Sequence, residues 1–238
     1  MPIPPTDAGP PVPTFQVSAA EVTMDAYASF ASQYVYRGVA LRDRPTSSFA
    51  LSTGTSYGWF VDLWSGLVDG DAQGDYASPR NNEWDLDSSV GYGAALDDNW
   101  LASLALARII EVGDGDGASH DYNEWRASVF YRDVARGQFA YSEDYFQRGW
   151  SSWNAELSGS HALTDMLSGE WGFGRSHGSG RDDNDYSYAW LGVYGVWWHT
   201  QWDARWVDSS HGARYVLDSG RAGNHLMLSV SWALHLLP

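Results

Sequence analysis

A period of two runs through most of the chain and constrains its fold more than any other feature. Apolar or small residues alternate with polar ones in residues 153–160, and the same alternation returns in residues 124–132 and 226–234. Successive side chains of a β-strand point to opposite faces, so each segment predicts a strand with one apolar and one polar face. Only Pro45 and Pro79 interrupt this region, which fits continuous strand pairing because proline cannot donate to a ladder.

Turn clusters rich in Gly, Asp and Asn divide the alternating region into segments of strand length. The connections alternate between short and long, as in a barrel with tight hairpins at one rim and loops at the other. The succession of such segments predicts an all-β fold. Their even number, with antiparallel neighbours, is what a closed antiparallel transmembrane β-barrel requires, and we predict that architecture. About twelve strands are predicted, at residues 22–38, 46–56, 59–69, 83–96, 100–112, 121–132, 136–146, 151–163, 167–177, 186–198, 200–208 and 223–236.

The start of the chain differs from the rest. Six of the nine prolines lie within the first thirteen residues, which show neither a helical nor a strand period. We expect residues 1–20 to form a Pro-rich flexible lead-in or periplasmic segment. Residues 21–238 are expected to form the transmembrane β-barrel domain.

Composition excludes several classes of function. The chain carries 30 Asp and Glu against 14 Lys and Arg, a formal net charge of −16, and nucleic-acid binding is not expected because it needs clustered basic side chains. Cysteine is absent, which rules out disulfides, a thiolate nucleophile and Cys-ligated metals. We expect no cofactor and no metal site. The acidic segment 113–117 has the composition of a calcium loop but lacks the spacing of one, so a flexible surface loop is expected.

The period alone does not show which face of the barrel is apolar. A soluble barrel turns its apolar face inward and a membrane barrel turns it outward, and both remain open. Tryptophan favours the membrane barrel, because many of the 14 Trp residues fall near strand ends, as in an aromatic girdle. The predicted girdle consists of Trp59, Trp84, Trp100, Trp125, Trp153, Trp171, Trp197 and Trp202.

Charged residues fall opposite the apolar set, in the middle of their strands. In a membrane barrel this face lines a water-filled lumen. The predicted pore-lining residues are Arg37, Asp62, Asp85, Asp87, Glu124, Arg126, Glu156, Glu170, Asp203 and Arg205. Arg37 shares its face with Asp25 and Gln33, where it sets a transverse field across a narrow pore or forms a structural ion pair; both interpretations are open.

Several short motifs resemble one family. Residues 32–39, Ser-Gln-Tyr-Val-Tyr-Arg-Gly-Val, resemble the opening strand of the TorF-type porin family, Gram-negative outer-membrane β-barrel proteins of unknown function. Residues 58–66 resemble its second hairpin, residues 83–92 its acidic strand ending in Gly-Tyr, and residues 122–125 its Tyr-x-Glu segment. The resemblance covers residues 22–146 and implies an outer-membrane barrel that passes small solutes.

Together these features predict a non-enzymatic outer-membrane channel for small polar or cationic solutes. Its expected partners are outer-membrane lipid, lipopolysaccharide and the solutes, whereas protein partners and oligomeric state are not predicted. A non-conducting barrel that serves as a scaffold or docks a partner is the alternative. An outer-membrane lipid hydrolase is the third hypothesis, with His161, His177 and His225 among its candidate residues, although the chain has no G-x-S-x-G elbow.

Overall fold

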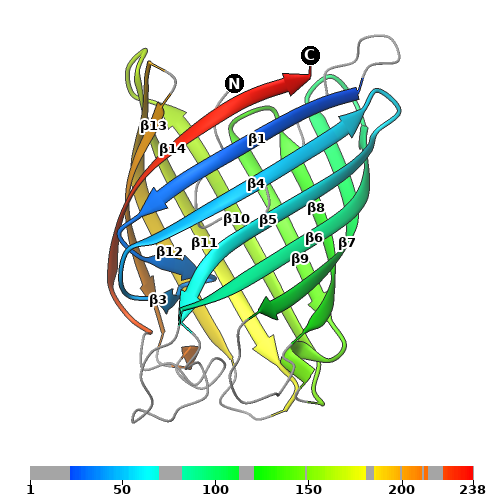
Figure 1. The fold of residues 1–238 in the computed structure, drawn as a ribbon, viewed down its shortest axis with the longest axis vertical. Coiled ribbons are helices and arrows are strands. Elements are labelled where there is room, and N and C mark those ends of the chain that lie inside the picture. The colour runs from blue at the N-terminus through cyan, green and yellow to red at the C-terminus, as the bar shows by residue number, and fades with distance from the viewer. Residues whose placement is uncertain are drawn as a thin grey trace.

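A closed antiparallel barrel dominates the computed structural model of the protein, which confirms the predicted fold class (Figure 1). Among the described residues the barrel has twelve strands, in the spatial order β1-β14-β13-β12-β11-β10-β9-β8-β7-β6-β5-β4. Pairing of β1 with β14, in which Ala28 lies opposite Trp232, closes it. The strands are β1 Val22–Ala31, β4 Thr46–Thr55, β5 Trp59–Asp69, β6 Asn82–Ala95, β7 Trp100–Val112, β8 Tyr122–Tyr131, β9 Ala135–Ser142, β10 Ser152–Ala162, β11 Leu167–Gly178, β12 Tyr186–Trp197, β13 Thr200–Ser209 and β14 His225–Leu237.

The structure describes most of the chain. It covers residues 22–69, 82–112, 121–147, 149–180, 185–198, 200–210, 212–213 and 222–237. The predicted lead-in at residues 1–20 and the acidic segment 113–117 lie outside these ranges. Within them, no helix is long and apolar enough to cross a lipid bilayer.

The two rims of the barrel differ in the length of their connections. Tight turns join β4 to β5, β6 to β7, β8 to β9, β10 to β11 and β12 to β13, whereas the connections at the other rim are longer. Gly58 shows why one tight turn needs glycine: its φ is +93°, and a Cβ there would lie 2.2 Å from the carbonyl oxygen of Gly93. We call the rim with the tight turns the short-turn rim and the opposite rim the long-loop rim.

The predicted strand at residues 22–38 is too long, because the chain leaves the barrel wall after Ala31. β1 ends at Ala31, and a separate two-stranded hairpin follows, β2 Tyr34–Tyr36 and β3 Val39–Arg42. The chain reverses at Arg37 and Gly38, whose φ angles are 49° and 79°. Positive φ at both central residues of a two-residue loop is the geometry of a type I′ hairpin turn.

The predicted strand at residues 136–146 is also too long. β9 ends at Ser142, and a short 3-10 turn, η1 Tyr145–Gln147, follows it. Phe146 has a φ of 53°, which breaks the extended backbone that a strand needs. This turn folds inward, since both Tyr145 and Phe146 are buried.

Burial alternates along the strands in the sense expected of a membrane barrel. On β5, Trp59, Val61 and Leu63 are exposed, whereas their neighbours Phe60 and Asp62 are buried. Apolar side chains of β11, β12 and β14 are likewise exposed, among them Trp171, Phe173, Leu191, Val193, Leu226 and Leu228. A soluble barrel would show the reverse, because burying apolar surface is what drives such a barrel to fold.

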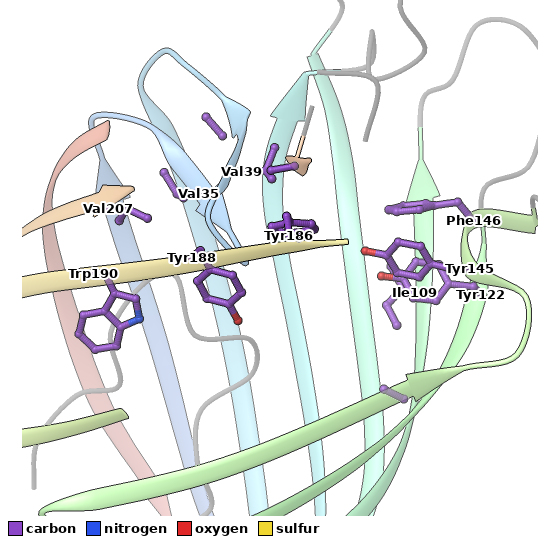
Figure 2. Packing of buried hydrophobic residues seen from close by; sticks show 13 residues of the cluster. Val35, Val39, Ile109, Tyr122, Tyr145, Phe146, Tyr186, Tyr188, Trp190 and Val207 are labelled. Carbon is purple, nitrogen blue, oxygen red and sulfur yellow. The ribbon is translucent and has the colours of Figure 1, made fainter. Parts of the chain in front are cut away.

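An apolar cluster fills part of the interior and includes the inserted hairpin (Figure 2). Val35, Val39 and Ala40 of the hairpin are 1% exposed or less. They pack with inward-facing residues of β7, β8, β12 and β13 and with η1. We call this set the hairpin core; its buried members are Val35, Val39, Ala40, Ala107, Ile109, Tyr122, Tyr145, Phe146, Tyr186, Tyr188, Trp190, Val207 and Ala213.

Candidate functional site

The β2–β3 hairpin reaches across the interior of the barrel. It leaves the wall between β1 and β4, yet its turn contacts β8 and β12, which are not neighbours of either strand. Gly38 lies against Tyr188 of β12 so closely that a Cβ would be 2.4 Å from the Cβ of Tyr188. At the same level, Val39 pairs with Ala222 in an isolated bridge. The hairpin therefore narrows the lumen towards the long-loop rim.

Arg37 anchors the tip of the hairpin to the opposite wall. Its Nη2 donates to both carboxylate oxygens of Glu124 on β8, each at 2.9 Å. The guanidinium carbon also lies 4.7 Å from the centre of the Tyr36 ring. Burial by itself lowers the pKa of Arg37, but the carboxylate of Glu124 opposes this and the pKa lies well above its ordinary value. Arg37 therefore stays charged.

Glu124 is held from a second side. Its Oε1 also accepts a hydrogen bond from Nε of Arg126 at 2.8 Å, and Nη2 of Arg126 donates to Asp87 of β6 at 2.5 Å. We call Arg37, Glu124, Arg126 and Asp87 the hairpin network. Glu124 and Arg126 lie two residues apart on one strand, so both point inward, and the network joins the hairpin to two wall strands.

A second group of charges lies entirely on the wall. Arg205 of β13 donates to Oε1 of Glu170 on β11, from Nε at 3.0 Å and from Nη2 at 2.8 Å. Asp203 Oδ2 is 3.5 Å from the same Nη2, and the Arg205 guanidinium lies 4.2 Å from the Trp190 ring centre. We call Glu170, Asp203, Arg205 and Trp190 the wall cluster.

Strand register builds the wall cluster. Glu170 lies opposite Gly192 on β12, and Gly192 lies opposite Arg205. A Cβ on Gly192 would approach Glu170 Oε1 to 2.6 Å. Glycine between the two charged residues therefore leaves the space in which they meet.

The structure places all ten residues predicted to line the pore in the interior. Nine lie on wall strands, where Asp85 and Glu156 are half-buried and the others are buried, and Arg37 lies at the hairpin tip. Asp62 accepts a hydrogen bond from Ser52 at 2.5 Å, and Glu156 accepts one from the Tyr188 hydroxyl at 2.8 Å. Their role in lining a pore remains a prediction.

The charges at the base of the hairpin were not predicted from the sequence. Nη1 of Arg42 donates to Oδ1 of Asp69 at 2.9 Å, and Nε of Arg44 donates to the same oxygen at 2.8 Å. Asp69 ends β5 and is 4% exposed. The arginines lie in a turn-like segment before Pro45, so no strand period marked them as inward-facing.

The eight tryptophans of the predicted girdle lie on the outer face. Seven are exposed and Trp153 is half-buried. Trp59 and Trp100 lie beside the short-turn rim and pack against tyrosines, with ring centres 5.3 Å from Tyr92 and 4.8 Å from Tyr131 respectively. Their role as a membrane girdle stays a prediction.

The histidines of the hydrolase hypothesis are scattered. His161 is exposed near the short-turn rim end of β10, whereas His177 lies towards the other end of β11 and bonds Asp185. His225 begins β14. These positions do not bring the three side chains to one site.

Known proteins share the fold but little sequence. No protein-family model and no curated protein sequence matches the chain. The KdgM porin structure aligns with a TM-score of 0.52 at 9% identity, covering 90% of this chain and 99% of that one. The NanC porin aligns with a TM-score of 0.50 at 12% identity over 89% and 100% of the two chains. An outer-membrane channel from Pseudomonas putida F1 aligns with a TM-score of 0.50 at 10% identity over 93% and 98%.

These alignments show that the chain has the fold of outer-membrane porins. All three neighbours are porins or channels by name and none is an enzyme. One further structure holds the KdgM porin in complex with disordered oligogalacturonate. The TorF-type resemblance finds no support of its own in these comparisons and stays a prediction.

Proposed function

We propose that the protein is a passive channel of the bacterial outer membrane that favours small cationic solutes over anions. The barrel has a porin fold, apolar side chains such as Trp59, Leu63 and Leu191 face outward, and charged side chains such as Asp62 and Glu124 face inward. An apolar outer belt suits a lipid environment, and a polar interior suits water. Outer-membrane lipid and lipopolysaccharide are then its surroundings.

The sign of the interior charge carries the proposal. Among the described residues, the buried charged residues comprise seven carboxylates and three arginines, and Arg37 at the hairpin tip adds a fourth arginine to the interior. Charge of one sign within low-dielectric walls focuses the field and concentrates counter-ions. Rings and clusters of carboxylates therefore favour cations in a pore.

The hairpin sets the size of solute that passes. Its hairpin core occupies part of the lumen on the long-loop side, with side chains that exclude water. The remaining passage admits only small solutes, and the current through each open channel is small. Larger solutes require the hairpin to move.

Ion selectivity in planar lipid bilayers tests the function. Under a KCl gradient, the reversal potential of the folded protein is expected to show preference for K⁺ over Cl⁻. The double variant Asp62→Asn/Asp203→Asn should reduce this preference, because both carboxylates are buried in the interior. Asp165→Asn, on an exposed short turn, is the matched control and should leave the preference nearly unchanged.

Two outcomes would reject the proposal. A preference for Cl⁻ would contradict the role of the interior carboxylates. The absence of any current, both from folded wild-type protein and from variants with a released hairpin, would leave a non-conducting scaffold barrel.

A further inference from the structure

The contacts of Arg37 point to a binding site for guanidinium compounds in the lumen, which the chain fills with its own side chain. We propose that Glu124, supported by Arg126, forms this site with the neighbouring aromatic rings, and that the hairpin is a tethered blocker whose guanidinium competes with guanidinium-bearing solutes. The inference rests on the proposed channel function and names both its solute class and its regulation.

The site is built around one fixed carboxylate. Glu124 is 1% exposed, and both its oxygens accept hydrogen bonds from Nη2 of Arg37 at 2.9 Å. Arg126 holds Oε1 from the other side at 2.8 Å and is itself held by Asp87. Charge-assisted hydrogen bonds of this kind are stronger than neutral ones, and a carboxylate fixed in this way is preorganised for a cation.

Aromatic rings complete the site. The Arg37 guanidinium lies over the Tyr36 ring, 4.7 Å from its centre. Tyr36 belongs to β2, so its ring is part of the site in Arg37→Ala with the hairpin in place, and it leaves with the hairpin when a solute displaces it. Tyr122 shares the inner face of β8 with Glu124, and its ring packs 4.9 Å from the ring of Tyr145. Flat rings beside a carboxylate favour a planar, weakly hydrated guanidinium over a compact ammonium ion.

The charges around the site explain why a cation must occupy it. Asp62 and Asp85 lie near enough to Asp87 and Arg126 to interact with them electrostatically. Within the described ranges, Arg37 and Arg126 are the arginines that hydrogen-bond this group of carboxyls, which includes Glu124, so without Arg37 one of the two bonded arginines is lost. Removal of Arg37 therefore leaves the Glu124 carboxylate with one arginine partner instead of two, and a cation fills the vacancy better than a neutral or anionic solute does.

Arg37 occupies the site through non-covalent contacts, so its occupancy is reversible. β2 and β3 contain three and four residues, and because a two-stranded hairpin of this size is marginally stable by itself, its place in the lumen depends on its packing against the wall. Tethering gives Arg37 an effective concentration of the order of millimolar or above, which a free solute must exceed. Solutes at lower concentration leave the wild-type hairpin in place.

Single-channel recording of the Arg37→Ala variant tests the site, with methylguanidinium chloride as the probe. The K⁺ current of this variant should exceed that of wild type and should fall saturably as methylguanidinium is added in the millimolar range. Methylammonium should bind about tenfold more weakly, because it lacks the planar face. Wild type should need about tenfold more methylguanidinium than the variant, because Arg37 competes.

Two further variants separate binding from folding defects. Arg132→Ala is the matched control: Arg132 also has a φ of 49°, but its Nε donates to Asn99 on an exposed turn. It should behave as wild type. Arg37→Ala/Glu124→Gln should conduct but lose the response to methylguanidinium, and heat-modified gel mobility should show that every variant is folded.

The failure of the inference is distinct from the failure of the channel. Suppose that Arg37→Ala carries a cation-selective current and that methylguanidinium reduces this current no more than it reduces the current of Arg132→Ala. The site is then absent and the channel stands. If nothing conducts, the channel proposal falls. In that case the unfolding temperature measures binding: millimolar methylguanidinium should raise it for Arg37→Ala but not for Arg37→Ala/Glu124→Gln. An equal shift in the two variants would overturn the site.

Discussion

The wall cluster and the hairpin network use the same chemistry in different structural settings. In each, an arginine bonds an inward glutamate, Arg205 with Glu170 and Arg37 with Glu124. Register along adjacent strands brings the wall pair together, with Gly192 between its members. The hairpin pair forms only because a short hairpin folds into the lumen. The wall pair therefore joins strands of the barrel to one another, whereas the hairpin pair joins the wall to a segment inside the barrel.

Removal of Arg205 is expected to have the largest effect. Arg205 is fully buried, so Arg205→Ala leaves the charge of Glu170 without its partner. Breaking a buried pair in this way costs about 3 to 5 kcal/mol of the free energy of unfolding. Urea unfolding of the protein in lipid vesicles measures this loss.

An exposed pair provides the control for that measurement. Arg175 lies 3.4 Å from Asp185, and its side chain is 58% exposed. Arg175→Ala should therefore cost less than about 1 kcal/mol. Equal losses in the two variants would show that the wall cluster does not contribute as a buried pair.

The replacement of Gly38 is expected to act on the hairpin. Gly38→Ala puts a Cβ 2.4 Å from Tyr188 Cβ at a φ of +79°. The backbone strain alone costs about 1 to 3 kcal/mol, and the clash adds to it, so the hairpin should leave its place. Trypsin should then cleave after Arg37, which mass spectrometry of the digest detects.

Gly149 separates the clash from the strain. It has a similar φ of +73°, and a Cβ there would meet nothing within 4 Å. Gly149→Ala should leave the Arg37 bond protected from trypsin. Protection of this bond in Gly38→Ala as well would show that contact with Tyr188 does not hold the hairpin.

A disulfide across the hairpin is expected to give a smaller, reversible effect on current. Val39 and Ala222 are bridge partners, and paired Cα atoms at this spacing suit a disulfide. Because the chain has no cysteine, Val39→Cys/Ala222→Cys introduces the sole pair. Oxidation should lower the mean current about twofold to fivefold by preventing hairpin release, and a reductant should restore it.

The single variant Val39→Cys shows whether the effect comes from the crosslink. Its current should not respond to the reductant. A double variant with the same current in both redox states, once gel mobility has shown the disulfide to be formed, would mean that the hairpin does not move during conduction.

The wall was accessible to prediction from sequence because its rule is local. A period of two, with turns between segments, predicts where β5 and β7 begin and end and which of their side chains share a face. Clustered apolar residues and tryptophans on one face indicated the outward side, and the structure exposes Trp59 and Leu63 there.

The hairpin was not predicted, because its residues are strand formers that follow directly on β1. Tyr34, Val35 and Tyr36 are aromatic or β-branched, so they favour a strand and were assigned to the one that begins at Val22. An Arg-Gly pair is a weaker turn signal than Asn-Gly or Asp-Gly, so the reversal at Arg37 and Gly38 was missed.

The sequence by itself determined most of the wall strands, the two faces of each strand and the excess of acidic residues on the inward face. These features follow from the order of neighbouring residues along a strand. Tertiary structure decided which charges meet. Arg37 and Glu124 are 87 residues apart, and their contact depends on closure of the barrel and on the inward course of the hairpin. No local pattern records a distance across the lumen, because it arises only when strands from the whole chain close into one barrel.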